Sequence, residues 1–102
     1  MFNKITANYM FGDILFGKTI EWANNTYNIV DNQNTNSFAI PDIDVSGDEL
    51  IKLEFNGSGQ VNVYQFDQNH SYIRVTSISS GGTIHLDSNT KFINVANSAG
   101  IF

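Results

Sequence analysis

The sequence predicts an all-β protein, an antiparallel β-sandwich, and three observations carry that prediction. Apolar and polar residues alternate along most of the second half of the chain, as half-buried strands require. Clusters of Asn, Asp, Ser and Gly interrupt these runs roughly every ten residues, a spacing typical of sandwiches and barrels. With 102 residues and no cysteine, the chain suffices for one packed domain and has neither disulfides nor a thiolate metal site.

The first 37 residues are the least regular part of the chain. The segments "ILFGKTIEW" and "TYNIV" read as strands, and Gly17 within the first indicates a bulge. The polar stretch from Asp31 to Ser37 predicts a loop. Met1 to Phe16 is apolar but aperiodic, so two interpretations stay open: an N-terminal arm that docks onto a neighbour, or an edge strand. Residues 17–102 then form the sandwich domain.

The second half of the chain predicts strands with a clear period of two. In "LIKLEF", Ile51, Leu53 and Phe55 share one face while Lys52 and Glu54 share the other. The segments "VNVYQF", "SYIRVTSI", "GTIHL" and "KFINVA" follow with the same alternation. We therefore expect about seven to nine short antiparallel strands in all.

Two predicted strands, "VNVYQF" and "FAIPDIDV", have particular features. The segment "VNVYQF" places its two valines and Gln65 on one face, and Asn62, Tyr64 and Phe66 on the other. Pro41, in "FAIPDIDV", has no backbone N–H to donate and belongs at an edge strand, a bulge or a strand end. The sequence thus places the Pro41 segment at a sheet border.

A polar stretch, Asp67 to Ser71, separates two predicted strands. Asp and Asn suit tight turns because their side chains bond the local backbone and tolerate left-handed geometry. The favoured interpretation is the corner of a hairpin, and a ligand-contacting loop is the alternative. Similar turn-forming clusters lie at Asn56–Gly59, Ser79–Gly82 and Asp87–Thr90.

Charge and hydropathy exclude several partner classes. Five Lys and Arg against ten Asp and Glu give a net charge of −5. Nucleic acids and anionic membranes require clustered cations, so neither is an expected partner. No apolar leader or run of transmembrane length is present, and we expect a soluble protein made in a cytoplasm. The cations are scattered, at Lys4, Lys18, Lys52, Arg74 and Lys91.

Four segments in this order resemble a small β-sandwich module of phage tail, baseplate and fibre proteins from phages of Gram-positive bacteria. Those modules have an extended entry strand ending in Ile-Pro, a Gly-Asp or Gly-Glu turn, a "V-x-x-Y-(D)-x-N-x-x-Y-I" segment and a closing "K-Y-I" strand. Asn94 stands where the closing strand usually carries Arg, and Asp42 where Val usually follows the proline. The matching residues here are Ser37–Pro41, Ser46–Glu49, Val63–Ile73 and Asn89–Val95. The resemblance implies a jelly-roll fold like that of carbohydrate-binding modules.

The sequence contains few groups suited to catalysis. His70 and His85 are its only imidazoles, and neither stands in a metal-binding or nucleophile motif. We expect no enzyme activity and no cofactor. The one acidic cluster favours solvated turns over a calcium site or a pair of glycosidase carboxylates, and we predict no metal there. It comprises Asp42, Asp44, Asp48 and Glu49.

Carbohydrate binding requires exposed rings beside planar polar groups. The candidates are Asn62, Tyr64, Tyr72 and Arg74. By strand parity Asn62 shares a face with Tyr64, and Tyr72 shares a face with Arg74. The alternative is that these tyrosines pack within the sandwich or at its rim, and we expect Trp22 to lie in the core.

Partner binding is the other expected activity. The segment "YMFGDILFG" carries more apolar area than an isolated arm should expose, and we expect it to contact neighbouring subunits. The protein is therefore predicted to be a non-enzymatic structural or accessory protein of a phage particle, on its head, neck, tail or baseplate. Its partners would be other virion proteins or further copies of itself. A glycan-binding module for host cell-wall attachment is the alternative, and a glycan-degrading enzyme is a more distant one. The candidate partner-binding residues are Met10, Phe11, Ile14, Leu15 and Phe16.

Overall fold

The computed structural model describes the backbone of residues 2–5 and all atoms of residues 15–33, 37–45, 50–53 and 60–97. Ten strands lie in this part of the chain, and no helix does. Their bounds are β1 (Phe2–Ile5), β2 (Leu15–Phe16), β3 (Lys18–Ala23), β4 (Thr26–Asp31), β5 (Phe38–Asp44), β6 (Leu50–Leu53), β7 (Gln60–Phe66), β8 (Tyr72–Ser79), β9 (Gly82–His85) and β10 (Phe92–Asn97).

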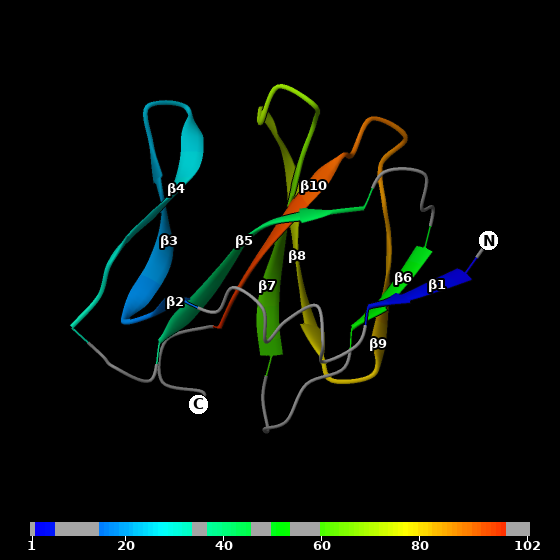
Figure 1. The fold of residues 1–102 in the computed structure, drawn as a ribbon, viewed down its shortest axis with the longest axis horizontal. Helices are drawn as coiled ribbons and strands as arrows, with labels where there is room; N and C mark the ends of the chain where they lie inside the picture. The colour runs from blue at the N-terminus through cyan, green and yellow to red at the C-terminus, as the bar shows by residue number, and fades with distance from the viewer. Residues whose placement is uncertain (1, 6–14, 34–36, 46–49, 54–59, 98–102) are drawn as a thin grey trace.

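The strands form three layers. A five-stranded sheet in the order β2-β5-β10-β7-β8 lies between a three-stranded sheet, β1-β6-β9, and the β3-β4 hairpin (Figure 1). Between β5 and β10 the chain crosses repeatedly from one of the larger sheets to the other. The predicted antiparallel sandwich is confirmed, with the exception that β1 pairs with β6 in parallel.

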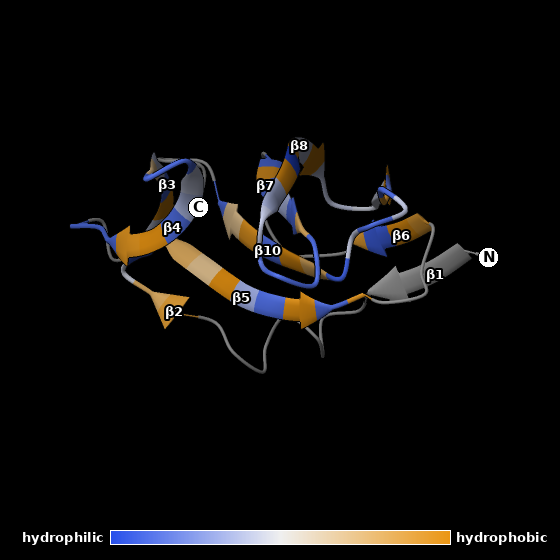
Figure 2. Ribbon diagram, turned by 90° about the horizontal axis from the view of Figure 1, so that it is seen from above, coloured by the Kyte–Doolittle hydropathy of each residue, from blue (hydrophilic) through white to orange (hydrophobic). Residues whose placement is uncertain are grey.

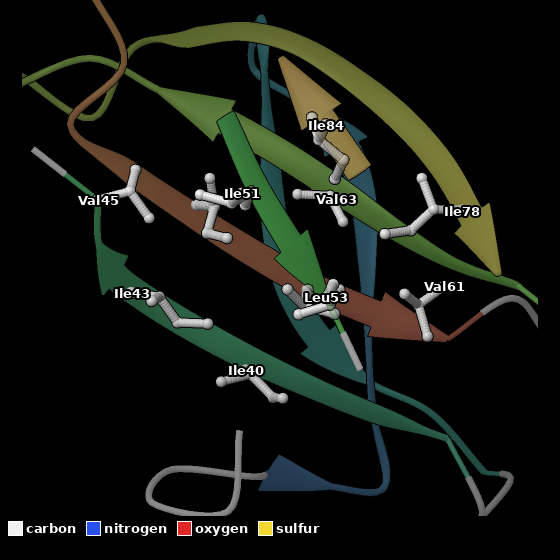
Figure 3. Packing of buried hydrophobic residues seen from close by; sticks show 11 residues of the cluster. Ile40, Ile43, Val45, Ile51, Leu53, Val61, Val63, Ile78 and Ile84 are labelled. Carbon is white, nitrogen blue, oxygen red and sulfur yellow. The ribbon is translucent and has the colours of Figure 1, made fainter. Parts of the chain in front are cut away.

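The main core lies between the two larger sheets. Alternate residues of β6, Ile51 and Leu53, are fully buried there, as the period-two pattern predicted. In Figure 2 the first residues of β5 have apolar colours, and polar and apolar colours follow one another toward its end. Figure 3 shows how side chains from the two sheets meet. The cluster comprises Ile40, Ile43, Val45, Ile51, Leu53, Val61, Val63, Ile78, Ile84, Ile93 and Val95.

A second core fills the opposite face of the five-stranded sheet. The β3-β4 hairpin covers this face and contributes Ile20, with Tyr27 and Ile29 packed alongside. Strand β7 consequently alternates between two buried environments, with Val63 in the first core and Tyr64 in the second. The other buried members are Ala39, Phe66 and Ala96.

Gly17 ends one strand and begins another, so the predicted bulge within a continuous strand is wrong. Its φ of 73° lies in the left-handed region that glycine adopts without strain. There its N–H donates to the carbonyl of Ser37 at 2.8 Å, and its own carbonyl accepts from the N–H of Asn32 at 2.8 Å. The chain thereby leaves β2, which pairs with β5, and enters the hairpin layer.

Pro41 lies at a border of the sheet, as expected because proline has no backbone N–H to donate. Strand β2 pairs only with Phe38 and Ala39 of β5, so Pro41 lies beyond that pairing. Asp42 has a φ of 51° and stands where the β5-β10 register shifts. The side-chain oxygen of Asn94 accepts the Asp42 N–H at 2.8 Å. Asn94, the residue that departs from the phage-module pattern, thus provides a hydrogen-bond acceptor for the backbone N–H of Asp42 at this bulge.

The described residues contain no helix, and so no helix among them could span a membrane.

Candidate functional site: a groove between two aspartate turns

Two turns of similar construction stand at the same end of the molecule, one between β7 and β8 and the other between β9 and β10 (Figure 1). In the first, the Asp67 carboxylate oxygen Oδ1 accepts the N–H of Asn69 at 2.8 Å and that of Ser71 at 2.9 Å. The Asp67 carbonyl accepts the N–H of His70 at 2.9 Å, and His70 has a φ of 61°. The hairpin-corner interpretation of Asp67–Ser71 is confirmed.

The second turn repeats this arrangement. Oδ1 of Asp87 accepts the N–H of Asn89 at 3.0 Å, and the Asp87 carbonyl accepts the N–H of Thr90 at 3.0 Å. In the sequence, both turns read Asp-x-Asn-x-x-aromatic, ending at Tyr72 and at Phe92. This repeat is the signal that could have revealed the pair of turns, because an aspartate two residues before an asparagine suits a side-chain-capped turn.

Gln65 attaches the second turn to the central sheet. Its side chain is fully buried, and its Oε1 accepts both the N–H of Asp87 at 2.9 Å and the hydroxyl of Thr90 at 2.7 Å. Its Nε2 donates to the carbonyl of His85 at 3.3 Å. Sequence reasoning placed Gln65 on the same face of β7 as two valines but gave it no role. A polar residue among valines on that face was the available signal, since buried amides need partners.

A groove with a volume of about 600 Å³ lies between the two turns. This size falls within the range of small-ligand sites in proteins. Most of the residues that line it have amide, hydroxyl or charged side chains, and one tyrosine and one isoleucine accompany them. The lining residues are Asp67, Gln68, Asn69, Tyr72, Ile73, Asp87, Ser88, Asn89 and Lys91.

A bulge at Ile73 determines which β8 side chains lie on the same face of the sheet as Tyr72. Phe66 pairs with Tyr72 and Gln65 pairs with Arg74, which leaves Ile73 as the extra residue. Directly paired residues share a face, so Tyr72 lies with Phe66 and Arg74 lies on the opposite face. The expectation that Tyr72 and Arg74 share a face is therefore wrong. The Arg74 guanidinium instead contacts the Asp87 carboxylate, at 3.4 Å.

Tyr72 connects the groove with a cluster of aromatic rings under the hairpin. Its ring lies 4.8 Å from that of Tyr27 and 5.7 Å from that of Trp22, both edge-on. The Trp22 side chain is 54% exposed, so its expected place in the core is wrong. Trp22 covers the outer side of the cluster because the hairpin forms a separate layer over the sheet.

Tyr64 occupies the inner side of this cluster. Only 5% of the residue is exposed, and its ring lies 4.8 Å from that of Tyr27. It shares a face with Asn62, as predicted, and Asn62 also accepts a hydrogen bond from the Ser77 hydroxyl at 2.6 Å. Because it is buried, Tyr64 has no free face on which a sugar could stack, which corrects its candidacy as a platform. Of the four carbohydrate candidates, Tyr72 is the one that lines the groove.

Burial raises the pKa of both tyrosines above the usual value for a phenol. For Tyr64, desolvation raises the pKa, and the hydrogen bond with Asn62 partly opposes it. For Tyr72, desolvation again acts first, and the neighbouring Tyr27 adds to it. Both hydroxyls are therefore protonated at neutral pH, and that of Tyr72 has a hydrogen-bond partner in the backbone of Val75 on β8.

In the described part of the acidic cluster, each aspartate contacts a basic side chain. Asp42 lies 3.7 Å from Nε2 of His70, whose ring stacks on Phe92 at 4.5 Å. Asp44 contacts the ammonium of Lys91 at 3.3 Å. In the part of the chain that the structure describes, no three His, Asp or Glu side chains are grouped to hold a metal ion. Asp48 and Glu49 lie outside that part.

The described part of the expected partner-binding segment forms an edge strand. Leu15 is 40% and Phe16 67% exposed on β2, the outermost strand of the five-stranded sheet. The backbone of Phe2–Ile5 forms β1 at the edge of the other sheet. Met10, Phe11 and Ile14 lie outside the described residues.

Comparisons of the chain with family models, curated proteins and solved structures found no match.

Proposed function

We propose that this protein is a non-enzymatic module that binds a glycan in the groove between its two aspartate turns. The observation that carries the proposal is the lining of that groove, where one tyrosine stands among residues with amide and hydroxyl side chains. Sugars offer apolar ring faces to aromatic side chains and hydroxyls to amides and carboxylates. The phage-particle setting, with attachment to a Gram-positive cell wall, rests on the sequence resemblance alone.

The groove walls are well suited to recognition. Both turns are held by side-chain hydrogen bonds and the second is also anchored through buried Gln65, so the backbone of the groove walls loses little conformational freedom on binding. The two aspartates each hold backbone N–H groups of their own turn. This structural use of both carboxylates favours binding over hydrolysis, because a glycosidase needs a freely acting acid and base across the bond.

The first test is a titration of the protein with purified cell-wall polysaccharide from Gram-positive bacteria. Trp22, the sole tryptophan of the chain, packs against Tyr72, so we expect ligand entry to change its fluorescence. Calorimetry then compares Tyr72→Leu with Tyr27→Leu. We expect the first to weaken binding about tenfold, because one stacked ring contributes roughly 1 to 2 kcal/mol. The second removes a ring of the same cluster that does not line the groove, and should retain most of the affinity.

Either of two results would contradict the proposal. One is the absence of binding to every wall polysaccharide tested. The other is an equal loss of affinity in the Tyr72 and Tyr27 variants with unchanged unfolding curves. Release of reducing sugar during the incubation would instead indicate an enzyme.

A second candidate function is that of an assembly component, and the exposed apolar side chains of β2 favour it. Leu15 and Phe16 extend from the outermost strand of the central sheet, where a neighbouring subunit could cover them. This docking would use the segment that the sequence identified. It is compatible with glycan binding, because β2 and β8 lie at opposite edges of the same sheet.

For this second function we expect the protein to self-associate in solution and the double variant Leu15→Ser/Phe16→Ser to be monomeric. Light scattering at several protein concentrations measures the difference. Val75→Ser is the matched control, because Val75 is also an exposed apolar residue, 38% accessible, but lies on β8. If the double variant and the control have the same mass as the original chain, β2 does not mediate contact between copies.

A further inference from the structure

An exposed apolar patch adjoins the groove on the side of the central sheet that faces the β3-β4 hairpin. It consists of Trp22, near the tip of the hairpin, with Tyr72 and Val75 on β8, and is called here the Trp22 patch. Tyr72 pairs with Phe66 and Val75 pairs with Tyr64, so both β8 residues lie on the hairpin side of the sheet. Trp22 is 54% and Val75 38% exposed, and Tyr72 is partly exposed.

The aromatic rings of the Trp22 patch are held in place by their neighbours. The Trp22 ring lies 5.7 Å from that of Tyr72 and 5.1 Å from that of Tyr27, both edge-on. The Tyr72 hydroxyl has a hydrogen-bond partner in the backbone of Val75, so Tyr72 connects the two other members of the patch. Rings that are fixed in this way lose little conformational freedom when a ligand stacks on them.

The polar groups next to the Trp22 patch are amides and hydroxyls. Asn24 and Asn25 form the exposed turn at the tip of the hairpin, directly after the strand that carries Trp22. Farther along the same face of β8, the Ser77 hydroxyl donates to the side chain of Asn62 at 2.6 Å. Neither the patch nor these four residues carry a charge. Aromatic rings flanked by neutral hydrogen-bonding groups suit uncharged sugar units.

We propose that the Trp22 patch is a second sugar-binding subsite, over which a glycan chain held in the groove continues past Tyr72 to Trp22. This inference rests on the proposed glycan-binding function and names its ligand class, a polysaccharide with several successive uncharged sugar units. Tyr72 lines the groove and packs against Trp22, so one chain can occupy the groove and the patch together. Because the second contact then acts at a high effective concentration, long chains should bind more tightly than short ones.

The test compares disaccharide fragments of the cell-wall polysaccharide with its longest soluble fragments, by calorimetry on the original chain and two variants. Trp22→Leu should bind the long fragments about threefold to tenfold more weakly and the disaccharides as the original chain does, because only long fragments extend from the groove to the patch. Phe16→Leu is the matched control. It removes another exposed ring, 67% accessible, at the opposite edge of the five-stranded sheet, and should leave both affinities unchanged.

A second measurement uses the unmodified protein. Trp22 is the sole tryptophan of the chain, so quenching of its fluorescence by acrylamide measures how accessible the patch is. We expect the long fragments to shield Trp22 from the quencher and the disaccharides to leave it accessible. Shielding that arises without sugar, when the protein concentration alone is raised, would assign the patch to contacts between copies of the chain and overturn this inference.

The remaining outcomes separate this inference from the proposed function. Equal affinity of Trp22→Leu and the original chain for long fragments overturns the second subsite and leaves glycan binding in the groove. An equal loss for long fragments and disaccharides also overturns it, because the tryptophan would then support the groove itself. Absence of binding to every fragment and to the intact polysaccharide overturns the proposed function as well. If unfolding curves show that Trp22→Leu does not retain its fold, the quenching measurement on the unmodified protein decides.

Discussion

Replacing Gln65 with leucine should lower the free energy of unfolding by about 3 to 5 kcal/mol, because it removes the partner of one buried and two partly buried hydrogen bonds at once. The N–H of Asp87 and the hydroxyl of Thr90 both lose their acceptor, and the carbonyl of His85 loses a donor. Each such loss costs about 1 to 3 kcal/mol in a buried site, and leucine recovers part of it through apolar contact. Denaturant unfolding followed by circular dichroism measures the change.

Thr90→Val is the partial version of the same change. It removes a single hydrogen bond to Gln65 and should cost about 1 to 2 kcal/mol. Because the second turn forms one wall of the groove, Gln65→Leu should also weaken glycan binding in molecules that remain folded. A loss below 1 kcal/mol for Gln65→Leu would mean that the amide does not hold this turn.

Replacing Ile93 with alanine should destabilise the protein by about 2 to 5 kcal/mol and lower its melting temperature by more than 10 °C. Ile93 is fully buried in the main core on β10, which pairs with β5 on one side and β7 on the other. Strands hydrogen-bonded on both sides cannot move to fill the space that the missing methyl and ethyl groups leave, so most of the cavity cost remains. Differential scanning calorimetry measures the effect.

Val75→Ala serves as the control for this prediction. Val75 is an exposed residue of an outer strand, so its truncation should cost less than about 1 kcal/mol. If Ile93→Ala melts within a few degrees of the original chain, the two larger sheets are not packed around this residue as described.

Much of the fold follows from the local pattern of the sequence. The alternation in "LIKLEF" predicted the burial of Ile51 and Leu53, since strand geometry alone sends alternate side chains to one face. The chemistry of Asp67–Ser71 predicted a hairpin corner, because an aspartate satisfies the turn with its own side chain. Pro41 predicted a sheet border for the same local reason, its missing donor.

The candidate site depended on contacts that no local pattern encodes. The bulge at Ile73 arises from how β8 pairs with β7, and it places Arg74 on the opposite face from Tyr72. Which face of β7 is covered depended on the hairpin, so Tyr64 is buried, and Trp22 is exposed, contrary to the expectation that it lies in the core.

The sequence by itself therefore determined most of the strands, the inward face of β6 and the two turns, because hydrophobic alternation and turn chemistry act over a few neighbouring residues. Only the tertiary structure decided that Gln65 would anchor the second turn and that the turns would enclose a groove. These features depend on residues about twenty positions apart, such as Gln65 and Asp87, and strand pairing alone brings such residues together.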